Sequence, residues 1–210
     1  VLYKITNFKW LPRPDATDTV FKSLQPAIRF TKEECLDLPD MIYTKRTVEM
    51  TRQQKKYYNE LKNKLVVQAG GERITAVNAA VEMNKLLQIA SGAIYTDDGE
   101  ALEFDIKHRY KVLREVIDES SKKVLVFVPF KHVIDVLTNK LIQDGIPTEI
   151  IRGDVSVNKR TDIFKRFQET DSPQVLVIQP QAAAHGITLT AANTVVWWGP
   201  TSSLETYAQA

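Results

Sequence analysis

The chain has 210 residues, 43% of them hydrophobic and 26% charged, which is enough for one full core and a smaller appendage. Its formal net charge of +2 does not demand a nucleic-acid partner, so a nucleic-acid site must be a local patch. Cys35 is the single cysteine, which excludes an internal disulfide and a cysteine metal cluster and predicts a reducing compartment. Apolar runs such as 124–130 are too short to cross a membrane, and no signal peptide opens the chain.

The first forty residues are predicted to be irregular, because prolines at 12, 14, 26 and 39 interrupt them. One short helix is expected over 18–24. A β-branched alternation then predicts a strand over 42–50.

Two helices are predicted next. Thr51 and Gln54 form a capping-box pattern, which predicts a helix from Arg52 to about Gln68. The lysines on its outer face are more typical of a solvated surface than of a DNA site. A second helix is expected over 76–90, ended by Gly92, and the Asp-Gly turn near residue 98 predicts a small hairpin.

From Asp105 onward strands and helices alternate, which predicts right-handed βαβ units and a parallel sheet. The continuous apolar run at 124–128 is typical of a strand covered on both faces. We therefore predict three parts: an irregular linker at 1–40, a mostly helical attachment at 41–104 and an α/β domain at 105–210. The expected strands are 124–128, 148–151, 175–178 and 195–198, and the expected helices are 105–119, 133–143 and 157–167.

A loop of small residues follows the predicted strand at 175–178. Ala182, Ala183, Ala184 and Gly186 leave backbone N–H groups open to close approach, which suits phosphate at the carboxyl edge of a parallel sheet. An ordinary strand-to-helix connection made of small residues explains the same pattern equally well.

The chain shows no motif of a self-contained enzyme. None of its eight glycines is followed by lysine, so a P-loop is absent, and no Gly-x-Gly-x-x-Gly follows a strand. The pair Asp118-Glu119 ends a helical pattern and is expected to be a solvated helix end. His108, His132 and His185 show no metal-ligand spacing.

Five stretches occur in an order that one family shares. They are LQPAIRFTKEECLDLP (24–39), KLLQIASGAIY (85–95), KVLVFVPFKHVIDVL (123–137), IIRGDVSVNKRTDIFKRFQ (150–168) and the run at 175–198, which leads into PTSSLETYAQA. In this order they resemble the linker and second motor lobe of superfamily-two helicases, in particular Swi/Snf-like DNA translocases. His185-Gly186 and the paired tryptophans 197 and 198 are similar to the phage-type subgroup.

The resemblance implies a RecA-like α/β fold: a parallel sheet with helices on both faces, preceded by a mostly helical attachment. It implies that the parent protein hydrolyses ATP with Mg²⁺ and tracks along DNA in a bacterial or phage-infected cytoplasm. This chain lacks the first motor lobe with its P-loop and Asp-Glu box, and it stops before the arginines of the sixth motif. We therefore expect it to be inactive alone, with no bound cofactor, and to need the preceding lobe as its partner.

The resemblance also carries residues over by motif. Contacts to the nucleic-acid backbone, which do not read sequence, are expected at Phe130, Lys131, Arg152, Gly153, Lys159, Arg160, Gln181, Ala182, Ala183 and Ala184. The ATP cleft is expected to receive His185, Gly186, Ile187, Glu205 and Gln209.

These residues also have structural interpretations. Arg152, Lys159 and Arg160 are equally suited to be surface charges, and Phe130 to be core. Of the paired tryptophans, one is expected in the core and the other beneath the cleft or a partner lobe. A competing hypothesis is a non-catalytic α/β module that binds a protein or DNA. A metabolic nucleotide-binding domain is poorly supported.

Overall fold

The computed structural model describes residues 1–28, 41–64, 66–69, 72–75, 78–183, 188–201 and 203–209. The chain forms two compact units, Val1–Lys45 and Arg46–Ala210.

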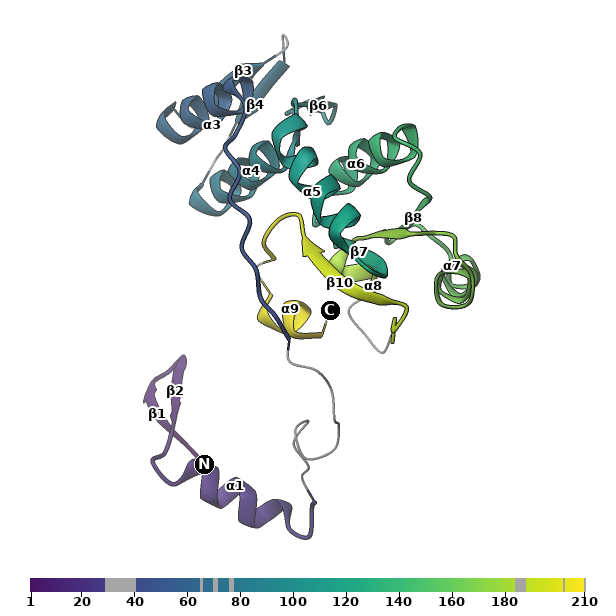
Figure 1. Cartoon of the computed structure of the whole chain (residues 1–210). Helices are drawn as coiled ribbons and strands as arrows, with labels where there is room; N and C mark the ends of the chain where they lie inside the picture. Colours follow the sequence, from purple (N-terminus) through teal and green to yellow (C-terminus); the bar gives the residue numbers. More distant parts are fainter. Residues whose placement is uncertain are drawn as a thin grey trace. The chain divides into compact units, whose positions relative to one another are not determined.

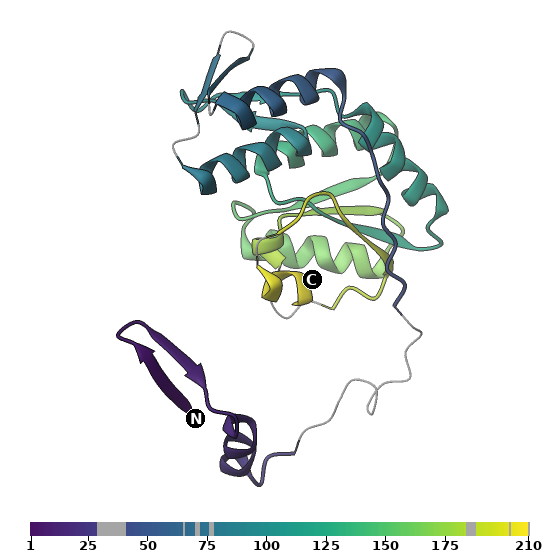
Figure 2. The ribbon, with the colours of Figure 1, turned by 90° about the vertical axis from the view of Figure 1, so that its left-hand side faces the viewer.

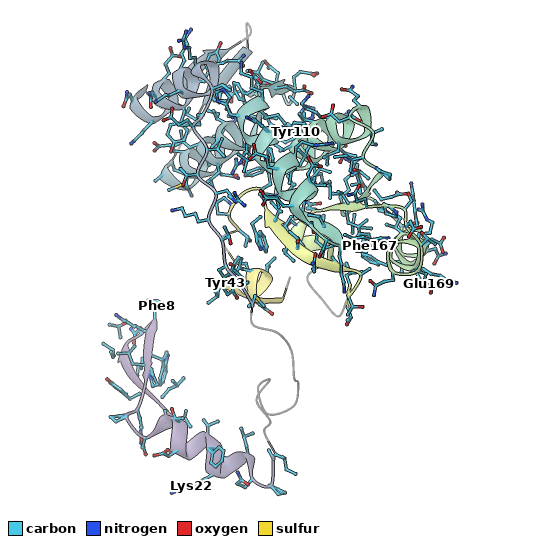
Figure 3. The ribbon with its side chains drawn as sticks, in the orientation of Figure 1. Phe8, Lys22, Tyr43, Tyr110, Phe167 and Glu169 are labelled. Atoms are coloured by element: carbon cyan, nitrogen blue, oxygen red, sulfur yellow. The ribbon has the colours of Figure 1, made fainter. Side chains whose placement is uncertain are left out.

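The first unit contains a hairpin and a helix (Figure 1). Strands β1 (Leu2–Thr6) and β2 (Lys9–Pro12) pair antiparallel, and helix α1 (Ala16–Leu24) follows. The helix was expected, whereas the prediction of an irregular start was wrong for the hairpin. Phe8, labelled in Figure 3, lies in the hairpin turn and is 98% exposed.

The predicted strand at 42–50 is wrong. Residues 41–50 form no strand, although their alternation of residue types is that of a strand. Ile42 and Tyr43 are exposed, and no described segment pairs with this one. A β-branched alternation favours an extended backbone, but a strand also needs a neighbour to complete its hydrogen bonds.

The predicted capping box is confirmed at the start of helix α3 (Arg52–Lys64). The Thr51 N–H donates to Gln54 Oε1 at 3.1 Å, and the Gln54 N–H donates to Thr51 Oγ1 at 3.4 Å. Gln54 is buried, and its Nε2 also donates to the Ile89 carbonyl at 2.9 Å. One side chain therefore both caps α3 and ties it to the next helix.

The helix ends earlier than the predicted Gln68. Strand β3 (Val66–Ala69) follows it and pairs antiparallel with β4 (Glu72–Thr75). Two β-branched residues at 66 and 67 and a Gly-Gly pair between the strands are hairpin signals.

Helix α4 (Ala79–Ser91) and the small hairpin of β5 (Ala93–Tyr95) and β6 (Ala101–Glu103) agree with prediction. The Asn78 side chain caps the helix by accepting the Val81 N–H at 3.0 Å. Gly92 ends it at φ 118°, a left-handed conformation that glycine adopts without steric cost.

The centre of the second unit is a four-stranded parallel sheet, which confirms the predicted α/β class. Its strands are β7 (Lys123–Phe127), β8 (Thr148–Ile151), β9 (Val175–Ile178) and β10 (Ala192–Trp197), in the spatial order β10-β7-β9-β8. Val124 lies opposite Val175, and Leu125 lies opposite Val195. All four strands end at the same edge because all run the same way.

Alternate residues of each central strand face opposite layers of helices. Val124, Val126, Val175 and Val177 pack with helices α5 (Lys107–Glu119) and α6 (Lys131–Gln143). The intervening residues pack with helix α7 (Val157–Glu169), which contributes Ile163 and Phe167. They are Leu125 and Phe127 of β7 and Leu176 and Ile178 of β9. Figure 2 shows the sheet between these two layers. Helices on both faces explain why the strands read as unbroken apolar runs.

Trp198 joins the attachment to the sheet. This side chain is 2% exposed, and its Nε1 donates to the Ser91 carbonyl at 2.8 Å. The Arg109 guanidinium lies 4.9 Å from the centre of its ring and donates to the Ala90 carbonyl at 2.8 Å. Burial lowers the pKa of Arg109. The end of α4, the start of α5 and the end of β10 thus share one packed contact.

Two short helices complete the unit, α8 (Pro180–Ala183) after β9 and α9 (Leu204–Gln209) after β10. Among the described residues, no helix combines the length and apolar character needed to cross a membrane.

Candidate nucleic-acid and nucleotide site

The parallel sheet brings the predicted contact residues to one edge. Phe130 and Lys131 follow β7, Arg152 and Gly153 follow β8, and Gln181 follows β9. Because these strands are neighbours and run the same way, the loops that leave their carboxyl ends lie side by side. Lys159 and Arg160 lie in the first turn of α7, directly after the β8 loop.

Lys131 and Lys159 are the cations of this edge that the structure leaves available. Lys131 is the first residue of α6 and Lys159 the third of α7, and both are exposed. Among the described residues, neither ammonium group has an ion-pair partner. Phe130 precedes α6 and packs against the core, as its structural interpretation predicted.

Arg152 is neutralised by two carboxylates. Its Nη1 lies 2.5 Å from Asp135 Oδ1 and its Nε 2.8 Å from Asp154 Oδ1. Burial acts to lower the pKa of Arg152, but the hydrogen bonds and charges of Asp135 and Asp154 outweigh it and raise that pKa. A phosphate would have to displace one of these carboxylates to reach the guanidinium. Arg152 is therefore less available to DNA here than the two lysines.

Arg160 ties loops together. It donates to the carbonyl oxygens of Val155 at 2.8 Å, Gly153 at 3.1 Å, and Arg152 and Ala182 at 3.3 Å. These bonds join the turn after β8 to helix α8 after β9. No carboxylate is among these partners, so the guanidinium still contributes positive charge to the edge.

Gln179 was missed by the sequence analysis. Its Oε1 accepts the Gly153 N–H at 3.3 Å, and its own N–H donates to the Ile151 carbonyl at 2.8 Å. The Gly153 amide is thus occupied within the protein. The position of Gln179, directly after a buried strand, is the signal that could have identified it.

The remaining predicted residues are divided between described and undescribed parts. Gln181 is exposed and Ala182 half-buried on α8, where Ala183 is the last residue. Glu205 is exposed on α9, and the backbone of Gln209 ends that helix. Ala184, His185, Gly186 and Ile187 lie outside the described residues.

Aromatic contacts hold α9 at this edge. The Trp197 ring lies 4.8 Å from that of Phe127, in a stacked arrangement, and 5.1 Å from that of Tyr207 on α9. Helices α8 and α9 also contact each other. The different environments of Trp197 and the buried Trp198 agree with the expectation that only one belongs to the core.

A cavity lies between the first turns of α3 and α5. It has a volume of about 390 Å³ and is lined by Thr51, Arg52, Gln53, Asp105, Lys107 and His108. The Asp105 carboxylate accepts the Lys107 N–H at 2.9 Å, and this bond lowers the pKa of Asp105. In the described part of the chain, no group of three His, Cys, Asp or Glu side chains could hold a metal ion.

Comparison with known proteins gives one family match. Residues 108–210 match the helicase conserved C-terminal domain. A protein called p41 from Acyrthosiphon pisum secondary endosymbiont phage 1 is 28% identical over 97% of this chain and 41% of its own length. An uncharacterized ATP-dependent helicase of Mycoplasma genitalium is 27% identical over 85% of this chain and 18% of its own length.

The fold is similar to that of a solved ATPase core. The Sulfolobus solfataricus SWI2/SNF2 ATPase core in complex with dsDNA matches with a TM-score of 0.55 and 22% identity, over 87% of this chain and 41% of that one. The chain thus spans less than half the length of each of these relatives. These matches confirm the resemblance indicated by the five stretches.

Proposed function

Because residues 108–210 match the helicase conserved C-terminal domain, we propose that the complete protein is an ATP-dependent DNA translocase or helicase. This chain is the C-terminal, second RecA-like lobe of that motor. The proposal is supported above all by the sheet edge, where the topology gathers Lys131 from the connection after β7 and Lys159 and Arg160 from the connection after β8. The dsDNA in the similar SWI2/SNF2 complex favours DNA as the substrate.

The lobe's contribution to DNA binding is electrostatic positioning. Lys131 and Lys159 place ammonium groups against backbone phosphates, which fixes the lobe on the strand without reading bases. Arg160 keeps the β8 and β9 loops together, so both loops move as one with the lobe. Opening and closing against a preceding motor lobe would then move these phosphate contacts stepwise along the DNA backbone.

ATP and Mg²⁺ are the cofactors that this proposal implies. Hydrolysis of bound ATP supplies the free energy for closure and opening. With no P-loop in this chain, the phosphates would be held mainly by the preceding lobe. The residues proposed to face the nucleotide from this side are His185, Gly186, Ile187, Glu205 and Gln209. A cytoplasmic location remains a prediction.

The test compares this chain with the same chain joined to the preceding lobe and the sixth-motif arginines. ATP hydrolysis is measured with and without duplex DNA. The joined protein should show DNA-stimulated turnover, and this chain alone should show none. Substitution of Gly186→Trp in the joined protein should abolish turnover, whereas Gly99→Trp, in an open turn, should not.

Two results would contradict the proposal. Appreciable turnover by this chain alone would contradict the assignment of the P-loop to another lobe. If the joined protein hydrolyses ATP at the same rate with and without DNA, a module that binds a protein partner is favoured instead.

A further inference from the structure

Helix α3 carries a second charged surface, away from the carboxyl edge of the sheet. Figures 1 and 2 show α3 on the outside of its unit, with α4 between it and the sheet. Its exposed residues include Arg52, Lys55, Lys56 and Lys62, and its only acidic residue is Glu60.

The four cations share one face of the helix. At about 100° per residue, they fall within roughly 120° of arc, together with Asn59 and Asn63. Leu61 and Gln54 are buried on the opposite side. The half-buried Glu60 lies at the rim of the arc. We call this set of four cations and two asparagines the α3 basic face.

The cations of this face have no carboxylate partners among the described residues. Helix α5 has the same length of 13 residues, yet three of its cations form ion pairs, Lys107 with Asp105, Lys111 with Glu115 and Arg114 with Asp118. Within this face, the Nζ of Lys56 lies 5.4 Å from the centre of the Tyr57 ring.

This arrangement costs free energy in the isolated chain. Arg52 has like charges three and four residues further on, at Lys55 and Lys56, and like charges at this spacing destabilise a helix. A polyanion laid along the face would relieve this repulsion. Arg52 and Lys62 are about 15 Å apart along the helix axis, whereas duplex DNA carries one charge per roughly 1.7 Å of its axis.

We propose that the α3 basic face is a second binding surface for the DNA backbone. It shares no residue with the proposed DNA contacts at the sheet edge, so DNA binding by either surface can be tested and refuted independently of the other. Lysine and arginine neutralise phosphates, and the two asparagine amides donate hydrogen bonds to phosphate oxygens. The sequence favoured a solvated face here, and the missing carboxylate partners are what alter that interpretation.

The neighbouring cavity adds little to this surface. Lys107 on its wall is paired with Asp105 at 3.3 Å, and the lowered pKa of Asp105 keeps that carboxylate ionised. An ionised carboxylate repels phosphate. The surface is therefore assigned to the outer side of α3 alone.

The test is a salt titration of duplex DNA binding by the full 210-residue chain, starting at about 20 mM salt. The variant Arg52→Gln/Lys55→Gln/Lys56→Gln/Lys62→Gln should lower the magnitude of the slope of log K against log salt by about 3.6, because each of the four phosphate contacts contributes roughly 0.9. The matched variant Lys55→Arg/Lys56→Arg/Lys62→Arg retains the charge and should keep the slope. Glu60→Gln should tighten binding.

A second readout locates the contact. Acetylation of lysines, followed by mass spectrometry, should show Lys55, Lys56 and Lys62 protected by DNA, while Lys111 on α5 serves as the reference. The pair Lys131→Gln/Lys159→Gln tests the sheet-edge tract separately and should leave the protection of α3 unchanged.

The proposal is overturned by any of three results. The first is that the unaltered chain does not bind DNA at about 20 mM salt. The second is that the glutamine variant keeps the slope of the unaltered chain. The third is that the glutamine variant loses binding to polyglutamate but keeps its binding to DNA. The last result would identify an acidic polypeptide as the partner.

Discussion

The two compact units differ in how much apolar surface they bury. In the described part of Val1–Lys45, Ala16 is the one buried hydrophobic residue, and large side chains such as Phe8, Trp10 and Phe21 are more than half exposed. In Arg46–Ala210, the strands β7 and β9 are covered on both faces. Regular hydrogen bonding exists in both units, but only the second has a core that can offset the entropy cost of ordering its chain.

The largest expected effect is in the core of the second unit. Substitution of Phe167→Ala should lower the free energy of unfolding by about 3–5 kcal/mol, because this fully buried ring packs between α7 and the sheet. Urea denaturation followed by circular dichroism measures it. Val157→Ala on the same helix, at a position 74% exposed, should change it by less than about 0.5 kcal/mol. Similar losses for the two variants would contradict the assignment of α7 to the core.

The end of α4 should be the next most sensitive place. A Cβ at Gly92 would lie 2.3 Å from Ile106 Cγ2, and its φ of 118° is unfavourable for any other residue. Gly92→Ala should therefore cost about 2–4 kcal/mol, as strain and overpacking add. Gly99→Ala, at φ 84° with open space around it, should cost only the backbone strain of about 1–2 kcal/mol. Equal losses would mean that Ile106 moves aside freely.

A smaller effect should distinguish the second unit at high pH. Burial and the 2.6 Å hydrogen bond to Asp144 raise the pKa of Tyr110 in the folded state. The stability from this group is complete below the unfolded pKa of about 10 and is lost as pH rises above it, by at most about 1.4 kcal/mol per pH unit.

Urea midpoints between pH 9 and 11 test this dependence. They should therefore fall less steeply in Tyr110→Phe than in the unaltered protein. Tyr43→Phe, at an exposed position, serves as the control. A Tyr110→Phe profile that is parallel to that of the unaltered protein would refute the coupling.

The smallest effect is expected from removing the first unit. Deletion of residues 1–45 should shift the unfolding free energy of the remaining chain by less than about 0.5 kcal/mol, because the unit boundary falls at this point. Calorimetry of both chains measures it. A loss above 2 kcal/mol would show that the first unit supports the second. The predicted boundaries at 40/41 and 104/105 remain predictions.

Much of the second unit could be predicted because local signals and tertiary structure agree there. The strands predicted at 148–151 and 175–178 coincide with β8 and β9, and the capping box at Thr51 and Gln54 starts α3 as expected. The failures share a cause. The strand predicted at 42–50 has no partner among the described residues, whereas β3 pairs with β4. Strand pairing depends on a second segment, so it cannot be predicted from one segment alone.

The candidate site shows the same division at the level of single side chains. Motif order identified which loops meet at the sheet edge, and the parallel strands place them there. It could not show that Arg152 is held by Asp135 and Asp154, or that Arg160 is bound to four carbonyls. Those partners come from separate segments, brought together only by folding.

The class of this protein can be read from its sequence, since the period of its apolar residues and the order of its motifs depend only on neighbours along the chain. The tertiary structure alone decided which of its cations are free. Among the described residues, Lys131, Lys159 and the cations of the α3 basic face have no carboxylate partner. Arg152, in contrast, is paired with Asp135 and Asp154. The physical reason is that the charge a residue offers to a ligand depends on what lies within a few ångströms in space.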